Sequence, residues 1–127
     1  MTIENIVTSL ELSKRLATFF VPGGNSLFYW AVMEDGEEPI IWRNASEPLE
    51  LIACAFTAVE LLEKLPKKRL GLQKITYGKR ESYYQASFRK YGDIMPMQIT
   101  NLSATEALGE LLYQIKKRES EERRNIL

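Results

Sequence analysis

The sequence contains no histidine and a single cysteine, Cys54. Histidine is the commonest general base and the commonest metal ligand in proteins, so its absence removes the usual centre of acid–base and metal chemistry. One cysteine cannot form an internal disulfide, and structural zinc needs several cysteine or histidine ligands. Cys54 lies in the apolar run 52–56, where a small buried thiol is typical. The sequence predicts a protein that is not an enzyme and has neither a cofactor nor a metal.

Paired carboxylates are the one catalytic alternative that the composition leaves open. The acidic residues, however, occur at helix starts, on helix faces and at a hairpin tip, where each has a structural role. No group of them has the spacing of a known catalytic motif. A small hydrolase built on carboxylates is therefore the least favoured of the three hypotheses drawn from this sequence.

Long apolar runs are also missing. No stretch approaches the roughly 20 apolar residues that a membrane helix needs, so we expect no membrane span and a cytoplasmic protein. At 127 residues and 45% hydrophobic composition, the chain fits one domain with a core of its own. We predict a single domain over 1–127 whose charged C-terminal tail frays from about residue 119.

Net charge is absent as well, because 17 basic residues balance 17 acidic ones, but the charges are unevenly distributed. Residues 1–63 carry 3 basic and 10 acidic groups, residues 64–90 carry 9 and 1, and residues 91–127 carry 5 and 6. No global field attracts the protein to nucleic acid or membrane. Any binding of that kind must come from the basic segment.

The basic segment also contains tyrosines, and basic groups beside aromatic rings on a sheet face are typical of modules that hold single-stranded nucleic acid. The candidates for such contacts are Lys74, Lys79, Arg80, Tyr83 and Arg89. In the alternative interpretation the tyrosines pack against helices, and the lysines keep a hairpin edge unpaired.

The stretch 26–33 is rich in apolar and aromatic residues and contains no charged residue. It predicts a strand with two apolar faces, which favours the centre of a sheet. Because few helices are available to cover both faces, Phe28, Trp30 and Val32 form a candidate interface, and a homodimer is one expectation.

Helix starts and hairpin turns predict the remaining elements. Capping-box patterns begin at Thr8, Thr57 and Ser103, each followed by apolar residues at helical spacing. Asp35-Gly36 predicts one hairpin, joining the stretch 26–33 to 40–42, and residues 78–80 join strands over 70–77 and 83–90. Residues 49–56 fit either a strand or a helical turn. The prediction is an α+β fold of order α-β-β-α-β-β-α, with an antiparallel sheet of two hairpins packed against three helices.

The chain resembles a family of small uncharacterised proteins of bacterial phage and prophage regions. The resemblance rests on the motifs Ile3-Glu4-Asn5, Ser9-Leu10-Glu11-Leu12-Ser13-Lys14-Arg15-Leu16, Ser26-Leu27-Phe28-Tyr29-Trp30, Ala55-Phe56-Thr57-Ala58, Glu60-Leu61, Leu65-Pro66 and Ala104-Thr105-Glu106-Ala107. The turn over 20–25, with its glycine pair, departs from the family pattern. The resemblance implies a mobile-element origin and a bacterial cytoplasm, and it brings no activity.

These observations together favour a phage-type accessory protein that acts by binding another protein or itself. Nucleic-acid binding by the basic hairpin 64–91 is the alternative function.

Overall fold

The computed structural model describes residues 6–20, 26–33, 35–42, 50–67, 69–77, 81–90 and 95–126. They form an α+β fold, as the sequence predicts, in the order α-β-β-β-α-β-β-β-α. The elements are α1 (Leu10–Leu16), β1 (Phe28–Val32), β2 (Ile40–Trp42), β3 (Glu50–Ala55), α2 (Ala58–Lys64), β4 (Leu70–Tyr77), β5 (Glu81–Phe88), β6 (Met97–Asn101) and α3 (Ala104–Ile126).

Both predicted hairpins are present, and each is extended by a third strand. The strands form two antiparallel sheets of order β2-β1-β3 and β4-β5-β6, rather than the single sheet expected. β1 is the central strand of its sheet, as its composition predicts. The stretch 49–56, which was ambiguous, contains β3, whereas β6 was not predicted at all.

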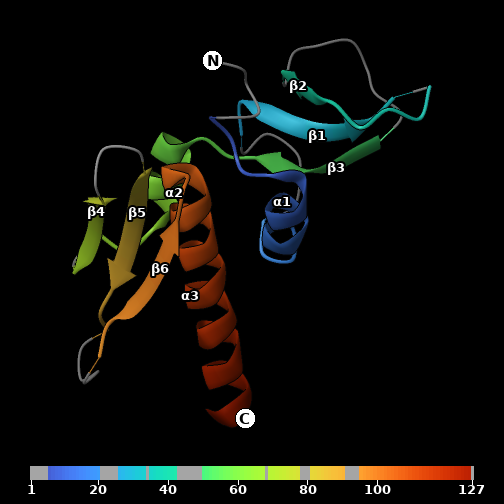
Figure 1. Ribbon diagram of the computed structural model, residues 1–127. Helices are drawn as coiled ribbons and strands as arrows, with labels where there is room; N and C mark the ends of the chain where they lie inside the picture. Colours follow the sequence, from blue (N-terminus) through green and yellow to red (C-terminus); the bar gives the residue numbers. More distant parts are fainter. Residues whose placement is uncertain are drawn as a thin grey trace.

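The helices lie between the two sheets (Figure 1). α1 packs against β3, α3 packs against β5 and β6, and α3 also contacts both α1 and α2. The main core lies where these elements meet and includes Leu16, Tyr29, Phe56, Leu61 and Leu108. The apolar stripe predicted for the third helix supplies much of it, with Ala107, Leu111, Leu112 and Ile115 all buried.

The capping box at the start of α2 is formed as predicted. The Glu60 backbone N–H donates to Thr57 Oγ1 at 3.3 Å, and the Thr57 N–H donates to Glu60 Oε1 at 3.0 Å. The same carboxylate accepts from the Leu27 N–H at 3.2 Å. Glu60 therefore joins the start of α2 to the chain entering β1.

The other two predicted caps differ from the expectation. The N-cap of α1 is Ser9 and not Thr8, because the Thr8 hydroxyl is buried and bonded to Ser13 and Phe56 instead. At α3 the Ser103 Oγ accepts from the Glu106 N–H at 3.3 Å. The Glu106 carboxylate does not fold back but accepts from the Ser9 N–H and hydroxyl, at 2.6 and 3.0 Å, and so ties α1 to α3.

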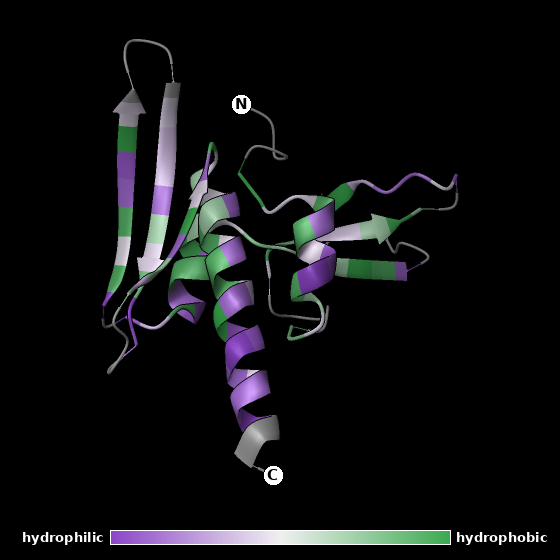
Figure 2. Ribbon diagram, turned by 60° about the horizontal axis from the view of Figure 1, so that its bottom comes forward, coloured by the Kyte–Doolittle hydropathy of each residue, from purple (hydrophilic) through white to green (hydrophobic). Residues whose placement is uncertain are grey.

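α1 and α3 differ greatly in length. The helical spacing of Leu12, Leu16, Phe19 and Phe20 predicts a first helix of about three turns, but α1 spans only seven residues and is followed by a turn through Phe20. α3 continues through the charged segment after residue 119 to Ile126. Figure 2 shows that this second half of α3 is mostly hydrophilic, whereas the first half carries the apolar stripe.

We expect Thr57→Ala to lower the free energy of unfolding by about 1 kcal/mol, because one orphan amide of α2 loses its acceptor. Chemical denaturation followed by circular dichroism measures this difference. Thr18→Ala, which changes an exposed threonine in the turn after α1, is the matched control and should change stability by less than about 0.5 kcal/mol. Equal losses in both variants would contradict the role of the cap.

A bidentate ion pair joins α1 to α3 and makes stability depend on pH. The two guanidinium nitrogens of Arg15 donate to the Glu110 carboxylate at 2.7 and 2.8 Å. Burial alone would raise the pKa of Glu110, but the hydrogen bonds from Arg15 and Gln114 and the charge of Arg15 outweigh it and hold the pKa below the usual 4.5. The pKa of Arg15 is raised, chiefly by the same hydrogen bond.

Because the pKa of Glu110 is lower in the folded state, its stabilising effect is complete above the unfolded pKa and is lost as pH falls through the folded value. Glu110→Gln should therefore cost up to about 1 kcal/mol at pH 7, since the pair is partly exposed, and less at pH 3, below the unfolded pKa. Denaturation curves at both pH values test this. Glu121→Gln, at an exposed position on α3, should show no such difference.

Candidate interaction site

The predicted nucleic-acid contacts do not form one surface in the part of the chain that the structure describes. Lys74 is paired with Tyr84 across the β4/β5 ladder, whereas Tyr83 is paired with Ile75. Neighbouring residues of a strand point to opposite faces, so Lys74 and Tyr83 lie on opposite faces of the hairpin. Lys79 and Arg80 are outside the described residues. Arg89 comes directly after the C-terminal end of β5.

Basic residues gather instead at the end of the second sheet where β4 begins and β5 ends. The Arg89 N–H donates to the Arg69 carbonyl oxygen at 3.3 Å, which holds these two chain segments together. Lys67 and Lys90 flank the pair in sequence, and all four side chains are exposed. We call these four residues, Lys67, Arg69, Arg89 and Lys90, the basic end.

The predicted interface on β1 is largely used within the chain. Phe28 is only 5% exposed and packs with Val7 and Ala55 in a small apolar cluster on the face of the sheet away from the main core. Trp30 and Val32 are half-buried, and the Trp30 indole Nε1 donates to the Thr8 carbonyl oxygen at 3.1 Å.

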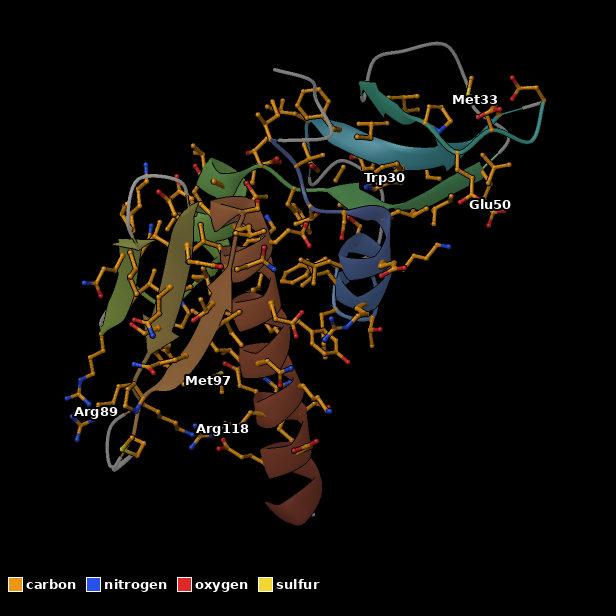
Figure 3. The ribbon with its side chains drawn as sticks, viewed as in Figure 1. Trp30, Met33, Glu50, Arg89, Met97 and Arg118 are labelled. Carbon is orange, nitrogen blue, oxygen red and sulfur yellow. The ribbon has the colours of Figure 1, made fainter. Side chains whose placement is uncertain are left out.

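A pocket with an apolar floor lies beside the basic end, between the second sheet and α3. Its volume is about 120 Å³. The floor is formed by Phe88 at the end of β5, Met97 at the start of β6 and Ile115 on α3. Figure 3 shows Met97 and Arg118 on the two sides of this region, with Arg89 at the nearby end of β5. The rim is charged and consists of Lys90, Arg118, Glu119 and Glu122.

An ion-pair network closes one side of the rim. Lys90 Nζ lies 2.8 Å from Glu122 Oε2, and Arg118 Nε lies 3.4 Å from Glu122 Oε1. The hydrogen bond from Lys90 is the main reason that the pKa of Glu122 is lowered. These groups are solvated, so salt weakens the network and little energy is needed to rearrange it. The rim can therefore exchange its internal pairs for charges on a ligand.

This pocket was not predicted because its floor comes from three separate elements. The side of the pocket that α3 forms could have been predicted from the sequence. Ile115 ends the predicted apolar stripe, and Arg118, Glu119 and Glu122 follow at i+3, i+4 and i+7, on the same side of the helix. The other half depends on Met97, whose strand was not recognised.

A second hollow lies on another side of α3, next to the turn after α1. Its volume is about 230 Å³, and it is lined by Phe19, Phe20, Lys116, Glu119, Ser120 and Arg123. Lys116 Nζ is 5.8 Å from the centre of the Phe20 ring, which is within cation–π range. Because its lining is mostly hydrophilic, this hollow offers less apolar contact to a ligand than the pocket beside the basic end does.

Within the described ranges, no three acidic or cysteine side chains lie close enough together to hold a metal ion. Cys54 is 1% exposed and packs in the main core, as its sequence context predicts. No helix in the described part of the chain is both long and apolar enough to cross a membrane.

Comparison with known proteins gives no relative. No family model, curated protein or solved structure matches the chain.

Proposed function

We propose that the protein is a non-enzymatic interaction module, of the phage accessory type that the sequence resembles, and that it binds a second protein through the pocket beside the basic end. The observation that carries the proposal is the combination of an apolar floor, Phe88, Met97 and Ile115, with a charged rim. A desolvated apolar centre surrounded by polar groups is the usual arrangement at the energetic centre of a protein interface.

The size and charge of the pocket support a partner of a particular chemistry. An apolar cavity of about 150 Å³ holds a ring the size of benzene, so a pocket of about 120 Å³ suits one leucine, methionine or phenylalanine side chain. Lys90 and Arg118 on the rim and Arg69 and Arg89 beside it favour acidic residues on either side of that anchor. The expected ligand is a short segment in which one apolar residue is flanked by aspartate or glutamate.

The chemistry of the lining supports binding more than catalysis. Its apolar side chains have no reactive group, and the Glu122 carboxylate is engaged by two cations. Such a carboxylate is a poor base, because its lowered pKa favours the charged form without any tendency to accept a proton near neutral pH.

Selection from a random peptide library displayed against the purified protein tests the proposal. Enriched peptides should carry one large apolar residue between acidic ones, and Met97→Glu should weaken their binding at least about tenfold, because a carboxylate would enter the apolar floor. The matched control is Gln98→Glu, which adds the same charge at the adjacent, exposed position on the other face of β6. It should bind within about twofold of wild type.

The proposal fails if the selected peptides are basic, if both variants bind equally, or if no peptide is enriched. Thermal melts of both variants show whether a loss of binding reflects unfolding.

Nucleic-acid binding is the second candidate function, and one observation favours it: the four exposed cations of the basic end lie together. In a gel-retardation assay, the binding constant for a single strand of mixed sequence would then decrease with salt. The logarithm of this constant should fall against the logarithm of the salt concentration with a slope of about −0.7 for each phosphate neutralised. Arg69→Ala with Arg89→Ala should flatten that slope by one to two contacts. Tyr83→Ala, on the sheet face, should leave the slope unchanged because stacking releases no counterions.

The same experiment can eliminate this second function. Wild-type protein that gives no shift at about 50 mM salt and tens of micromolar protein does not bind single strands usefully.

A further inference from the structure

The outer edge of β4 is a second surface, separate from the pocket, and it faces away from the other strands of the described sheet. β4 spans eight residues and is the first strand in the order β4-β5-β6, so no strand of the described chain lies on its other side. Figures 1 and 2 both show β4 at the margin of the molecule. An edge of this length is a template for another strand.

The ladder identifies which groups point outward. The Arg89 N–H donates to the Arg69 carbonyl oxygen, so 69 and 89 form a hydrogen-bonded pair in the β4/β5 register. Hydrogen-bonded and non-hydrogen-bonded pairs alternate along an antiparallel ladder. Residues 71, 73 and 75 therefore bond to β5, and the backbone N–H and C=O groups of Leu70, Leu72, Lys74 and Thr76 face the free edge.

This edge has few of the features that normally prevent pairing. It contains no proline, and its register with β5 is continuous, whereas the β1/β3 ladder contains a bulge. The one charged side chain, Lys74, has its Nζ 5.9 Å from the centre of the Tyr84 ring, so it is directed toward β5 and not across the edge. Leu72, an apolar residue, is 44% exposed. Edge strands that stay unpaired are usually short, bulged or guarded by an outward charge.

We propose that β4 pairs antiparallel with β4 of a second copy of the chain, about a two-fold axis at Gln73, and joins the two β4–β6 sheets into one. In this register Leu70 pairs with Thr76 of the other copy and Leu72 with Lys74. All the outward groups of the four residues then find partners. The result is about eight backbone hydrogen bonds, which is within the range of a typical interface.

The side chains favour this register and a second copy of the chain. Moving the axis to Lys74 would place the two lysines directly opposite each other, which is destabilising. Moving it to Leu72 would set Thr76 opposite residue 68 of the other copy, which precedes the start of β4. With the axis at Gln73, the Gln73 amides face each other and can donate and accept mutually. Ile75 then faces Gly71, which has no side chain.

Cysteine crosslinking tests the axis directly. Gln73 lies at a non-hydrogen-bonded position on the axis, where the Cα atoms of the two copies would be about 4.5 Å apart. That separation is within the range for a disulfide. Gln73→Cys should therefore convert mostly to a disulfide-linked dimer under mild oxidation at micromolar concentration, as seen by non-reducing electrophoresis. Gln98→Cys, at an exposed position of β6 on the same sheet face as Gln73, should form no disulfide-linked dimer. The buried Cys54 does not interfere.

Two proline substitutions test which backbone N–H groups of β4 point outward. Lys74→Pro removes an outward N–H and should convert the dimer to a monomer in sedimentation experiments, with little change in melting temperature, while Lys74→Ala should remain dimeric. Gln73→Pro removes an N–H bonded to β5 and should lower the melting temperature strongly. Wild-type protein that sediments as a monomer at about 100 µM, or equal crosslinking of Gln73→Cys and Gln98→Cys, overturns the proposal. Met97→Glu should not affect dimerisation, so the test is independent of the pocket.

Discussion

Replacing Thr8 by valine is expected to lower the free energy of unfolding by about 2–4 kcal/mol, although the two side chains have nearly the same shape. Thr8 is fully buried beside α1. Its Oγ1 accepts from the Phe56 N–H at 3.2 Å and lies 2.6 Å from Ser13 Oγ. Valine would leave the Phe56 N–H without an acceptor in the core, and it would remove one of two partners of the Ser13 hydroxyl, which also donates to the Thr8 carbonyl oxygen at 3.2 Å.

Thr8→Ser is the control that separates hydrogen bonding from apolar packing. Serine keeps the hydroxyl and loses one methyl group, so it should cost only about 1 kcal/mol. If apolar burial decided the outcome, the order would reverse and valine would be the better substitute. Denaturation curves of the three proteins measure the order directly, and a valine variant as stable as wild type would contradict the role of the hydroxyl.

The segments around Thr57 and Asp35 show which parts of the fold were predictable. A capping box is made by residues three apart, and both of its hydrogen bonds are present at Thr57 and Glu60. The Asp35 Oδ1 accepts from the Glu37 N–H at 2.9 Å, and Gly36 has a φ of 84°, as the Asp-Gly turn signal implies. In each case neighbouring residues determine the geometry.

β6 and Glu106 show why other parts were not predictable. β6 has five residues, and only its alternate positions, Met97 and Ile99, pack toward the core. So short a pattern is too weak until β5 supplies its partner. Glu106 has the correct spacing to close a capping box, but a partner 97 residues away, Ser9, takes its carboxylate. Tertiary contacts overrode the local pattern at both places.

The candidate site was only partly predictable for a related reason. The concentration of positive charge in residues 64–90 is a property of the sequence, and the structure places part of it at one end of the sheet. Which residues share a face depends on the β4/β5 register, and a shift of one residue reverses the face of every side chain in a strand. The sequence does not specify that register, so Lys74 and Tyr83 were grouped although they lie on opposite faces.

Gly109→Ala is expected to lower the free energy of unfolding by about 2 kcal/mol, against the normal helix preference for alanine. Gly109 is buried in α3 where the helix crosses α1, and a Cβ there would lie 2.7 Å from Leu12 Cδ2 and 3.0 Å from Thr8 Cγ2. Both neighbouring side chains are buried in the core, so Leu12 must be displaced or the helices must separate to admit the methyl group. Leu12→Ala is the discriminating background, because it removes the closest clash. There Gly109→Ala should cost much less than in wild type, with a coupling energy of about 1–3 kcal/mol from a double-mutant cycle of denaturation curves. Additive effects would show that close approach of α1 and α3 is not the reason for glycine at this position.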